Sequence, residues 1–337
     1  MATGSVSAQR LTAHRGTVRN AYNYWFYVPS VEPQSDAITV PPVVIDSVHG
    51  EEGDLRVAER QKPLIIFLHG ASLCGNSLSM VRRYGTIDAL TRGLKLDAYV
   101  LAPQNPGGPW VPAKVNHIVD WALKRFAIDS TRIYVLGMSL GGFGTIDYSA
   151  EYPQRVAAGM ALCGGGSTKK FSNLLEVPLC ILHGTDDKAV AWSYSQAVVD
   201  SMRAVGDTTR LIYRLLPGRN HSILARYFYL KETYDWLFQH SLADEKRPVN
   251  RNYNFGIQIT TSIYQLLEKP SNLVVEDSQK GWNREEDVMP RSGIHTVRKG
   301  DTLTKIAKRR RTTVDKLCRL NNLKRTSVLK PGQKIKY

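Results

Sequence analysis

One serine in this 337-residue chain stands in a setting that favours nucleophilic chemistry. The segment Gly137-Met138-Ser139-Leu140-Gly141 directly follows the apolar run 133–136, which predicts a buried strand that ends in a tight turn. A serine at the tip of such a strand-to-helix turn has a strained backbone, and the residues two before and two after it must be small. The turn would lift the hydroxyl above the sheet edge. Because G-x-S-x-G also arises by chance, a nucleophile at Ser139 requires suitable partners.

Two later loops could supply the acid and the base that this serine needs. On this type of turn the expected order is serine, acid, histidine, with each partner just after a later strand. The apolar runs 177–182 and 211–216 predict those strands; Asp186 and Asp187 follow the first, and His221 follows the second. Only one of the adjacent aspartates can face the histidine. Two other histidines precede glycines at strand ends and are interpreted as structural turn residues: His69 and His183.

An earlier loop could complete the group of catalytic residues by helping to form an oxyanion hole. An oxyanion hole needs one backbone N–H from the residue after the nucleophile and another from the loop after an earlier strand. The strand predicted at 64–68 is followed by His69, Gly70 and Ala71. We therefore expect the N–H groups of Ala71 and Leu140 to form the oxyanion hole.

The elements that must position these residues alternate between strands and helices. Short continuous apolar runs suit strands that are buried on both faces of a parallel sheet, and they occur at 64–68, 98–101, 133–136, 159–162, 179–182 and 211–216. Helical spacing of apolar residues predicts helices at about 115–126, 191–205 and 223–237. The alternation predicts a doubly wound α/β domain with a mostly parallel sheet.

With these motifs in place, residues 24–240 resemble the α/β-hydrolase fold, and within it the carboxylesterase, phospholipase and predicted-peptidase group. More specific marks are Ala102-Pro103-Gln104, Gly141-Gly142-Phe143-Gly144-Thr145 and Cys163-Gly164-Gly165-Gly166. The group is similar to feruloyl and acetyl-xylan esterases and to polyester depolymerases. The His-Gly-x-x-Asp spacing of similar hydrolases implies that Asp187, rather than Asp186, is the acid.

The resemblance implies a serine esterase that cleaves carboxylic esters through an acyl-enzyme, with Ser139, His221 and Asp187 as a triad and with neither a cofactor nor a metal. Two alternatives stay open from the sequence. The same triad can cleave amides, so the enzyme could be a peptidase. The hydrolase domain could also be a non-catalytic scaffold in a glycan-binding protein.

The chain is longer than one ordinary domain, and its composition changes along its length. Residues 1–20 are interpreted as a leader, because their small residues resemble the end of a signal peptide. Residues 21–243 form the predicted hydrolase domain, and 244–294 a linker in which 257–264 could add a strand. Among the four cysteines, Cys74 and Cys163 fall at the catalytic end of the sheet, where free thiols are expected and a bridge is the alternative.

Nearly all of the net charge of +15 lies in residues 295–337, which hold 14 Lys and Arg against two Asp. A turn at 299–302, helical spacing at 303–307 and 313–320, and an alternating run at 334–337 predict a strand-helix-helix-strand unit. This unit resembles a LysM domain, a module that binds N-acetylglucosamine-containing glycans such as peptidoglycan or chitin. The resemblance implies a glycan groove at these residues: Gly300, Asp301, Thr302, Leu303, Leu329, Lys330 and Pro331.

The basic tail also raises the possibility of nucleic-acid binding, because Arg309-Arg310-Arg311 stands on a small basic domain. No aromatic platform is interleaved with these basic residues, as single-stranded binding would need. We therefore expect a glycan partner and no nucleic acid. No apolar run approaches the roughly 18 residues of a transmembrane helix, and we expect the protein to act outside the cytoplasm, secreted, periplasmic or on the cell surface.

Overall fold

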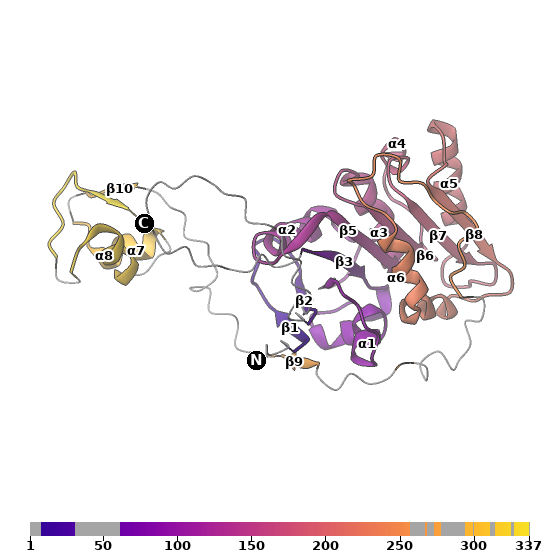
Figure 1. Ribbon diagram of the computed structural model, residues 1–337, viewed down its shortest axis with the longest axis horizontal. Helices are drawn as coiled ribbons and strands as arrows, with labels where there is room; N and C mark the ends of the chain where they lie inside the picture. Colours follow the sequence, from indigo (N-terminus) through magenta and orange to yellow (C-terminus); the bar gives the residue numbers. More distant parts are fainter. Residues whose placement is uncertain are drawn as a thin grey trace, which may run out of the picture. The chain divides into compact units, whose positions relative to one another are not determined.

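In the computed structural model the chain forms two compact units, residues 1–278 and 279–337 (Figure 1). Each unit is described by itself. The structure describes residues 8–30, 61–256, 267, 273–277, 294–298, 300–310, 314–324 and 327–336.

The first unit is built on a sheet that has nine strands within the described residues. In chain order they are β1 Arg10–His14, β2 Asn23–Val28, β3 Lys62–Leu68, β4 Tyr99–Gln104, β5 Ile128–Met138, β6 Ala158–Leu162, β7 Leu179–Gly184, β8 Leu211–Leu216 and β9 Val274–Glu276. Their order across the sheet is β8-β7-β6-β5-β3-β4-β2-β1-β9. The six strands from β3 to β8 are mutually parallel, whereas β2 runs antiparallel to both β4 and β1. The predicted mostly parallel sheet is confirmed.

Helices cover both faces of this sheet (Figure 1). They are η1 Ala71–Leu73, η2 Leu78–Arg82, α1 Thr86–Thr91, α2 Pro112–Leu123, α3 Leu140–Glu151, α4 Phe171–Leu174, α5 Ser193–Val205, η3 Ser222–Tyr229 and α6 Lys231–Phe238. Alternate residues of one strand reach different layers: Ile65 and Phe67 pack with α1, η3 and α6, while Leu64 and Ile66 pack with α2. Burial on both faces explains why the strands read as continuous apolar runs.

The structure differs from the expected boundaries of this unit at both ends. Residues 10–14, expected in the leader, form β1 and pair with β2. Within the expected linker, β9 pairs with β1, while the strand suggested at 257–264 lies outside the described residues. The single helix expected at 223–237 is also wrong, because η3 ends at Tyr229 and Leu230 takes an extended backbone before α6 begins.

The second unit is a small strand-helix-helix-strand module, as the sequence predicts. Its elements are β10 Ile294–Thr296, α7 Leu303–Arg310, α8 Val314–Asn321 and β11 Lys334–Lys336. β10 and β11 pair antiparallel, and the helices close over a core made of Val297, Leu303, Ile306, Ala307, Leu317 and Ile335. The basic tail is therefore a folded module with its own apolar core.

Two further expectations concern membranes and thiols. In the described part of the chain, no helix is both long and apolar enough to cross a bilayer. All four cysteines have free thiols, and of the two near the catalytic end Cys163 is buried while Cys74 is partly exposed.

Candidate active site

Ser139 occupies a strained turn between β5 and α3. Its backbone has φ 59° and ψ −124°, a conformation that an L-residue adopts only at a cost of about 1–3 kcal/mol. A Cβ at Gly141 would lie 1.8 Å from the carbonyl oxygen of Leu68, and one at Gly137 would lie 2.4 Å from that of Gly141. Both flanking positions therefore exclude any side chain, as the sequence pattern requires. Ser139 is half-buried.

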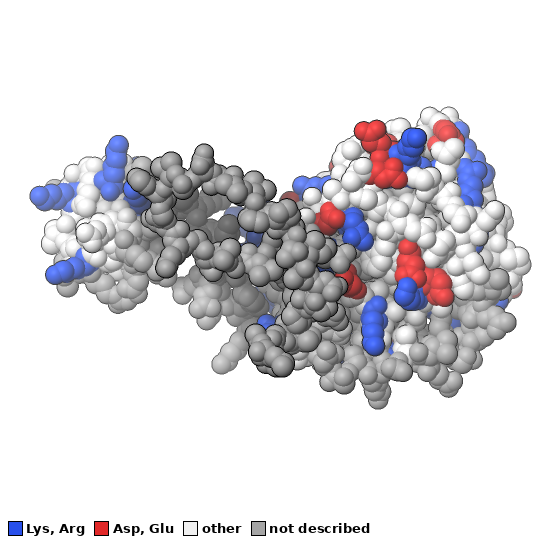
Figure 2. Space-filling view, viewed as in Figure 1, with Lys and Arg blue, Asp and Glu red and all other residues white. Residues whose placement is uncertain are grey.

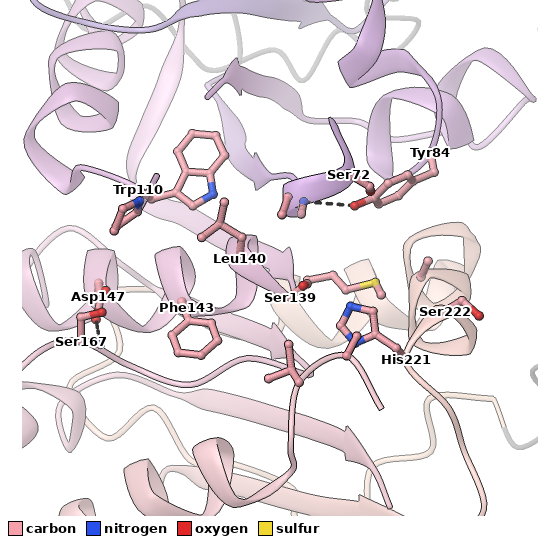
Figure 3. A pocket seen from close by; sticks show the side chains of 17 residues that line it. Ser72, Tyr84, Trp110, Ser139, Leu140, Phe143, Asp147, Ser167, His221 and Ser222 are labelled. Atoms are coloured by element: carbon pink, nitrogen blue, oxygen red, sulfur yellow. Dashed lines mark hydrogen bonds between the residues drawn. The ribbon is translucent and has the colours of Figure 1, made fainter. Parts of the chain in front are cut away.

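His221 and Asp187 come together beside this turn. The Nδ1 atom of His221 lies 2.6 Å from Oδ2 of Asp187, and the imidazole stands next to Ser139 in the cavity (Figure 3). His221 follows β8 and immediately precedes η3, and Asp187 follows β7. Hydrogen bonds between catalytic groups are often long in a substrate-free enzyme and shorten when substrate binds. The arrangement therefore suits a serine that is activated by a histidine and an acid.

Asp187 is held so that its carboxylate stays ionised. Burial would raise its pKa, but the N–H groups of Val190 and Ala189, each 2.9 Å from Oδ1, together with His221, hold the pKa below its usual range. Asp186 is exposed, and its contact is with the hydroxyl of Thr185. Of the two adjacent aspartates, Asp187 is thus the one in contact with His221.

The loop after β3 brings its backbone to the other side of Ser139. Among the described residues, neither the N–H of Ala71 nor that of Leu140, the first residue of α3, has a partner. Asn105 donates its N–H to Nε2 of His69, so Nδ1 carries the hydrogen and donates to the Gly70 carbonyl oxygen at 2.8 Å. The His69 ring therefore anchors this loop inside the fold.

Two aromatic side chains also hold the loop. The Gly70 N–H donates to the hydroxyl of Tyr84 at 3.1 Å, and the indole N–H of Trp110 donates to the His69 carbonyl oxygen at 3.2 Å. Burial lowers the pKa of His69 to about 4, so the ring stays neutral at ordinary pH. The backbone that would bind an oxyanion is thus fixed before substrate arrives, which is what electrostatic catalysis requires.

A cavity of about 780 Å³ opens over these groups. Its wall includes Ser139 and His221 together with apolar side chains that sequence reasoning missed (Figure 3). The residues that line it are Gly70, Ala71, Ser72, Tyr84, Pro109, Trp110, Met138, Ser139, Leu140, Phe143, Asp147, Ser167, Ala189, Val190, His221, Ser222 and Ala225. Helical spacing from Leu140 could have found Phe143 and Asp147, whereas nothing local marks Tyr84 or Trp110.

Asp187 also contacts a second serine–histidine pair. The Oγ atom of Ser195 lies 2.6 Å from Nδ1 of His183, whose Nε2 is 3.3 Å from Oδ2 of Asp187. Both residues are fully buried, and Ser195 donates its hydrogen to the carbonyl oxygen of Gly164. Nε2 of His183 also lies 2.9 Å from the Val190 carbonyl oxygen. Neither residue lines the cavity, so this pair joins parts of the core together.

The thiol of Cys163 lies close to the carboxylate of Asp187. Ligand atoms of Cys163, Asp187 and His221 all lie within 4.8 Å of one another, a spacing that could hold a metal ion. Burial, reinforced by the negative charge of Asp187, raises the pKa of the Cys163 thiol. A protonated thiol is a poor metal ligand, and Asp187 already bonds to His221. This group therefore fits a metal ion badly.

In the C-terminal module, two of the residues expected to contact a glycan have buried side chains that stabilise the fold. The side chain of Asp301 is almost fully buried and accepts hydrogen bonds from the Arg298 N–H, from His295 and from Arg309. The Arg298 N–H and His295 lower the pKa of this carboxyl to about 2. Leu303 lies in the core. At these two positions only the backbone is left to contact a glycan.

The other expected contacts are more accessible. Gly300, Thr302, Lys330 and Pro331 are exposed, and Leu329 is partly buried. Val328, in the same loop, is 89% exposed. On the face drawn in Figure 2, the coloured side chains of this module are Lys and Arg, whereas the first unit shows both signs of charge.

Comparison with known proteins finds a matching domain family and several more distant relatives. Residues 295–336 match the LysM domain family. The chain is 30% identical over 148 residues to poly(3-hydroxyalkanoate) depolymerase C of Paucimonas lemoignei, which covers 39% of this chain and 34% of the depolymerase. It is 28% identical over 115 residues to a probable carboxylesterase SOBER1-like protein of Arabidopsis thaliana, which covers 32% of this chain and 43% of that protein.

The chain therefore spans less than half the length of each of these relatives. Among solved structures, a thermostable esterase superposes with a TM-score of 0.49 and 24% identity, over 68% of this chain and 63% of that one.

Proposed function

Because the chain combines an α/β-hydrolase fold related to carboxylesterases with a C-terminal LysM domain, we propose that it is a serine esterase directed to a glycan surface. The observation that carries the proposal is the group formed by Ser139, His221 and Asp187 at the cavity. In this proposal the hydrolase unit cleaves the ester, and the LysM domain holds the protein at the glycan surface.

In the proposed reaction, the hydroxyl of Ser139 attacks the ester carbonyl carbon while Nε2 of His221 takes its proton. Asp187, held ionised, stabilises the imidazolium that forms. The N–H groups of Leu140 and Ala71 bind the oxygen that becomes negative. His221 then gives its proton to the departing alkoxide, which leaves as an alcohol. Water then attacks the acyl-serine while His221 takes one of its protons, and His221 gives that proton to the oxygen of Ser139 as the carboxylic acid leaves.

The test of the catalytic proposal is to label the protein with a fluorophosphonate and to locate the adduct by peptide mass spectrometry. We expect one adduct, on Ser139, together with hydrolysis of p-nitrophenyl acetate and butyrate. An adduct on Ser195 would overturn the assignment. Cleavage of aminoacyl-nitroanilides at the expense of esters would identify a peptidase with the same residues.

We propose that the LysM domain binds an N-acetylglucosamine-containing glycan, peptidoglycan or chitin, outside the cytoplasm. Its exposed loop residues and its basic surface support this assignment. A pull-down compares the full chain with residues 1–294 on insoluble peptidoglycan, chitin and DNA across a salt series. The full chain alone should be retained on a glycan, and part of this binding should survive high salt, which screens charge but not groove contacts. Equal retention of both forms, or retention on DNA alone, would contradict the proposal.

A further inference from the structure

A second, smaller pocket lies against the first residues of β8, the strand at one end of the described sheet (Figure 1). Its volume is about 170 Å³, and it is lined by Arg203, Arg214 and Arg251 together with Thr208 and residues 211–213. No described residue lines both this pocket and the cavity at Ser139. Pockets for whole small molecules usually measure about 300–1,000 Å³, so this one has room for a single small group.

Two of the three arginines are held in place by backbone carbonyl groups. Nη2 of Arg214 donates to the carbonyl oxygens of Arg251 at 2.6 Å and of Tyr253 at 2.9 Å, and its guanidinium lies over the ring of Phe255. Nη2 of Arg251 donates to the Thr208 carbonyl oxygen at 2.7 Å. Among the described residues, neither guanidinium forms an ion pair with a carboxylate. Carbonyl oxygens fix a guanidinium without cancelling its charge, and each group has further N–H donors. Both arginines are therefore positioned for an anion before it binds.

Arg203, in the last turn of α5, adds a third positive charge. Its Nη1 lies 3.5 Å from Oδ1 of Asp200, and both side chains of this pair are more than half exposed. Exposed ion pairs contribute little free energy, so Arg203 can turn to a ligand at small cost. Within the described part of the chain, Asp200 alone forms an ion pair with any of the three arginines. The pocket therefore carries an excess of positive charge.

Tyr213 adds a neutral donor to the same pocket. Its hydroxyl is buried and has no hydrogen-bond partner among the described residues. Burial raises the pKa of Tyr213, the charge of Asp200 raises it further, and the charge of Arg203 lowers it. The hydroxyl is therefore close enough to Arg203 to be affected by its charge, and it stays protonated at neutral pH. A buried hydroxyl without a partner is costly, and an anionic oxygen in the pocket would relieve that cost.

We propose that this pocket binds one phosphate-type oxyanion, held by Arg203, Arg214 and Arg251 and by the hydroxyl of Tyr213. Guanidinium groups suit such a ligand, because their paired N–H donors match the spacing of phosphate oxygens. The group can be free phosphate or the phosphodiester of a larger molecule, and both present the same oxygens. Because the pocket shares no residue with the cavity, this binding does not depend on the proposed esterase reaction.

The test labels the full chain with phenylglyoxal, which modifies arginine, and follows each arginine by peptide mass spectrometry. Labelling is compared in inorganic phosphate, in dimethyl phosphate and in sodium chloride at equal ionic strength. Phosphate at twice its Kd should slow the labelling of Arg203 and Arg251 about threefold relative to chloride, by mass action. The exposed Arg83, outside the pocket, should be labelled at the same rate in each salt. Protection by dimethyl phosphate as well would identify a site that accepts a phosphodiester, and protection by phosphate alone a site for the free ion.

The variant Arg203→Gln should weaken the site without disturbing the two arginines that hold backbone carbonyls. The phosphate concentration that gives half-maximal protection of Arg251 should rise about tenfold, as expected when a hydrogen bond to a charged group is lost. Tyr213→Phe should raise it by a smaller factor, because a neutral donor is removed. Arg83→Gln removes the same charge from an exposed position outside the pocket and should leave the wild-type value unchanged. Thermal unfolding followed by circular dichroism checks that each variant is folded.

Two outcomes would overturn the inference. Equal labelling of Arg203 and Arg251 in phosphate and in chloride would show that these arginines respond only to ionic strength. Equal half-protection values in Arg203→Gln and Arg83→Gln would show that phosphate acts through the overall positive charge of the protein rather than through this pocket.

Discussion

Two serine–histidine pairs in this molecule share one carboxylate, and they differ in nearly everything else. His221 meets Asp187 through Nδ1 and leaves its other nitrogen toward the cavity that holds Ser139. His183 approaches the same carboxylate through Nε2, and its Nδ1 faces the fully buried Ser195. Contact among a serine, a histidine and an aspartate is therefore insufficient to define an active site. Access to the hydroxyl, a strained turn and nearby free N–H groups distinguish the first pair.

Removing each serine hydroxyl in turn is the most direct test of which pair is catalytic. Ser139→Ala should lower kcat for p-nitrophenyl butyrate by a factor of about 10⁴–10⁶, because no nucleophile is left. Ser195→Ala should change kcat by less than about threefold but lower the free energy of unfolding by about 1–3 kcal/mol, since a buried hydrogen-bond network is interrupted. Initial rates and urea unfolding measure the two effects. Reversed roles, with Ser195→Ala inactive, would show that the second pair is catalytic.

The shared carboxylate provides the next test. Asp187→Asn should lower kcat by about 10⁴-fold, because the amide favours the wrong imidazole tautomer in His221. It should also reduce stability, because it contacts both histidines. The matched variant Asp186→Asn keeps the loop and changes an exposed carboxylate, so its kcat should stay near the wild-type value. If Asp186→Asn were the inactive variant, the acid would have to be reassigned.

A third test concerns buried histidines and pH. Burial lowers the pKa of His183 and lowers those of His14, His69 and His240 to about 4. In the unfolded chain they titrate near 6.5, so between about pH 6.5 and 4 the unfolded state binds more protons than the folded one. The stability that these neutral histidines contribute to the folded state is therefore complete above about pH 6.5. The melting temperature should fall as the pH drops from about 6.5 to 4. A melting temperature that is constant from pH 7 to 4.5 would contradict these shifts.

A structural feature can be predicted from the sequence when the residues that determine it are close together in the chain. The six parallel strands are predicted because burial on both faces makes each a continuous apolar run, and the crowded glycines around Ser139 follow from the strained turn itself. The order of Ser139, Asp187 and His221 follows from the same strand ends. By contrast, β1 and β9 are short edge strands whose pairing depends on residues distant in the chain. The break at Leu230 has no glycine or proline to announce it.

The site is predicted less completely than the sheet, because its walls come from separate loops. Tyr84 and Trp110 reach the cavity through tertiary packing that no spacing reveals. In the C-terminal module, Asp301 has the residue type of a sugar ligand, but its carboxylate is used by His295 and the Arg298 N–H. A polar residue in a functional loop can thus be structural, and only its contacts distinguish the two roles.

Helix α3 has two sides that differ in their tolerance of change. On one side, Gly141 and Gly142 approach the backbone of β3 and β6 so closely that no side chain fits. On the other side, Leu140, Phe143 and Asp147 line the cavity. Substitutions on the second side can reshape the cavity without moving the turn that carries Ser139. During evolution, a single helix could therefore keep its nucleophile fixed while its accepted substrates diverged.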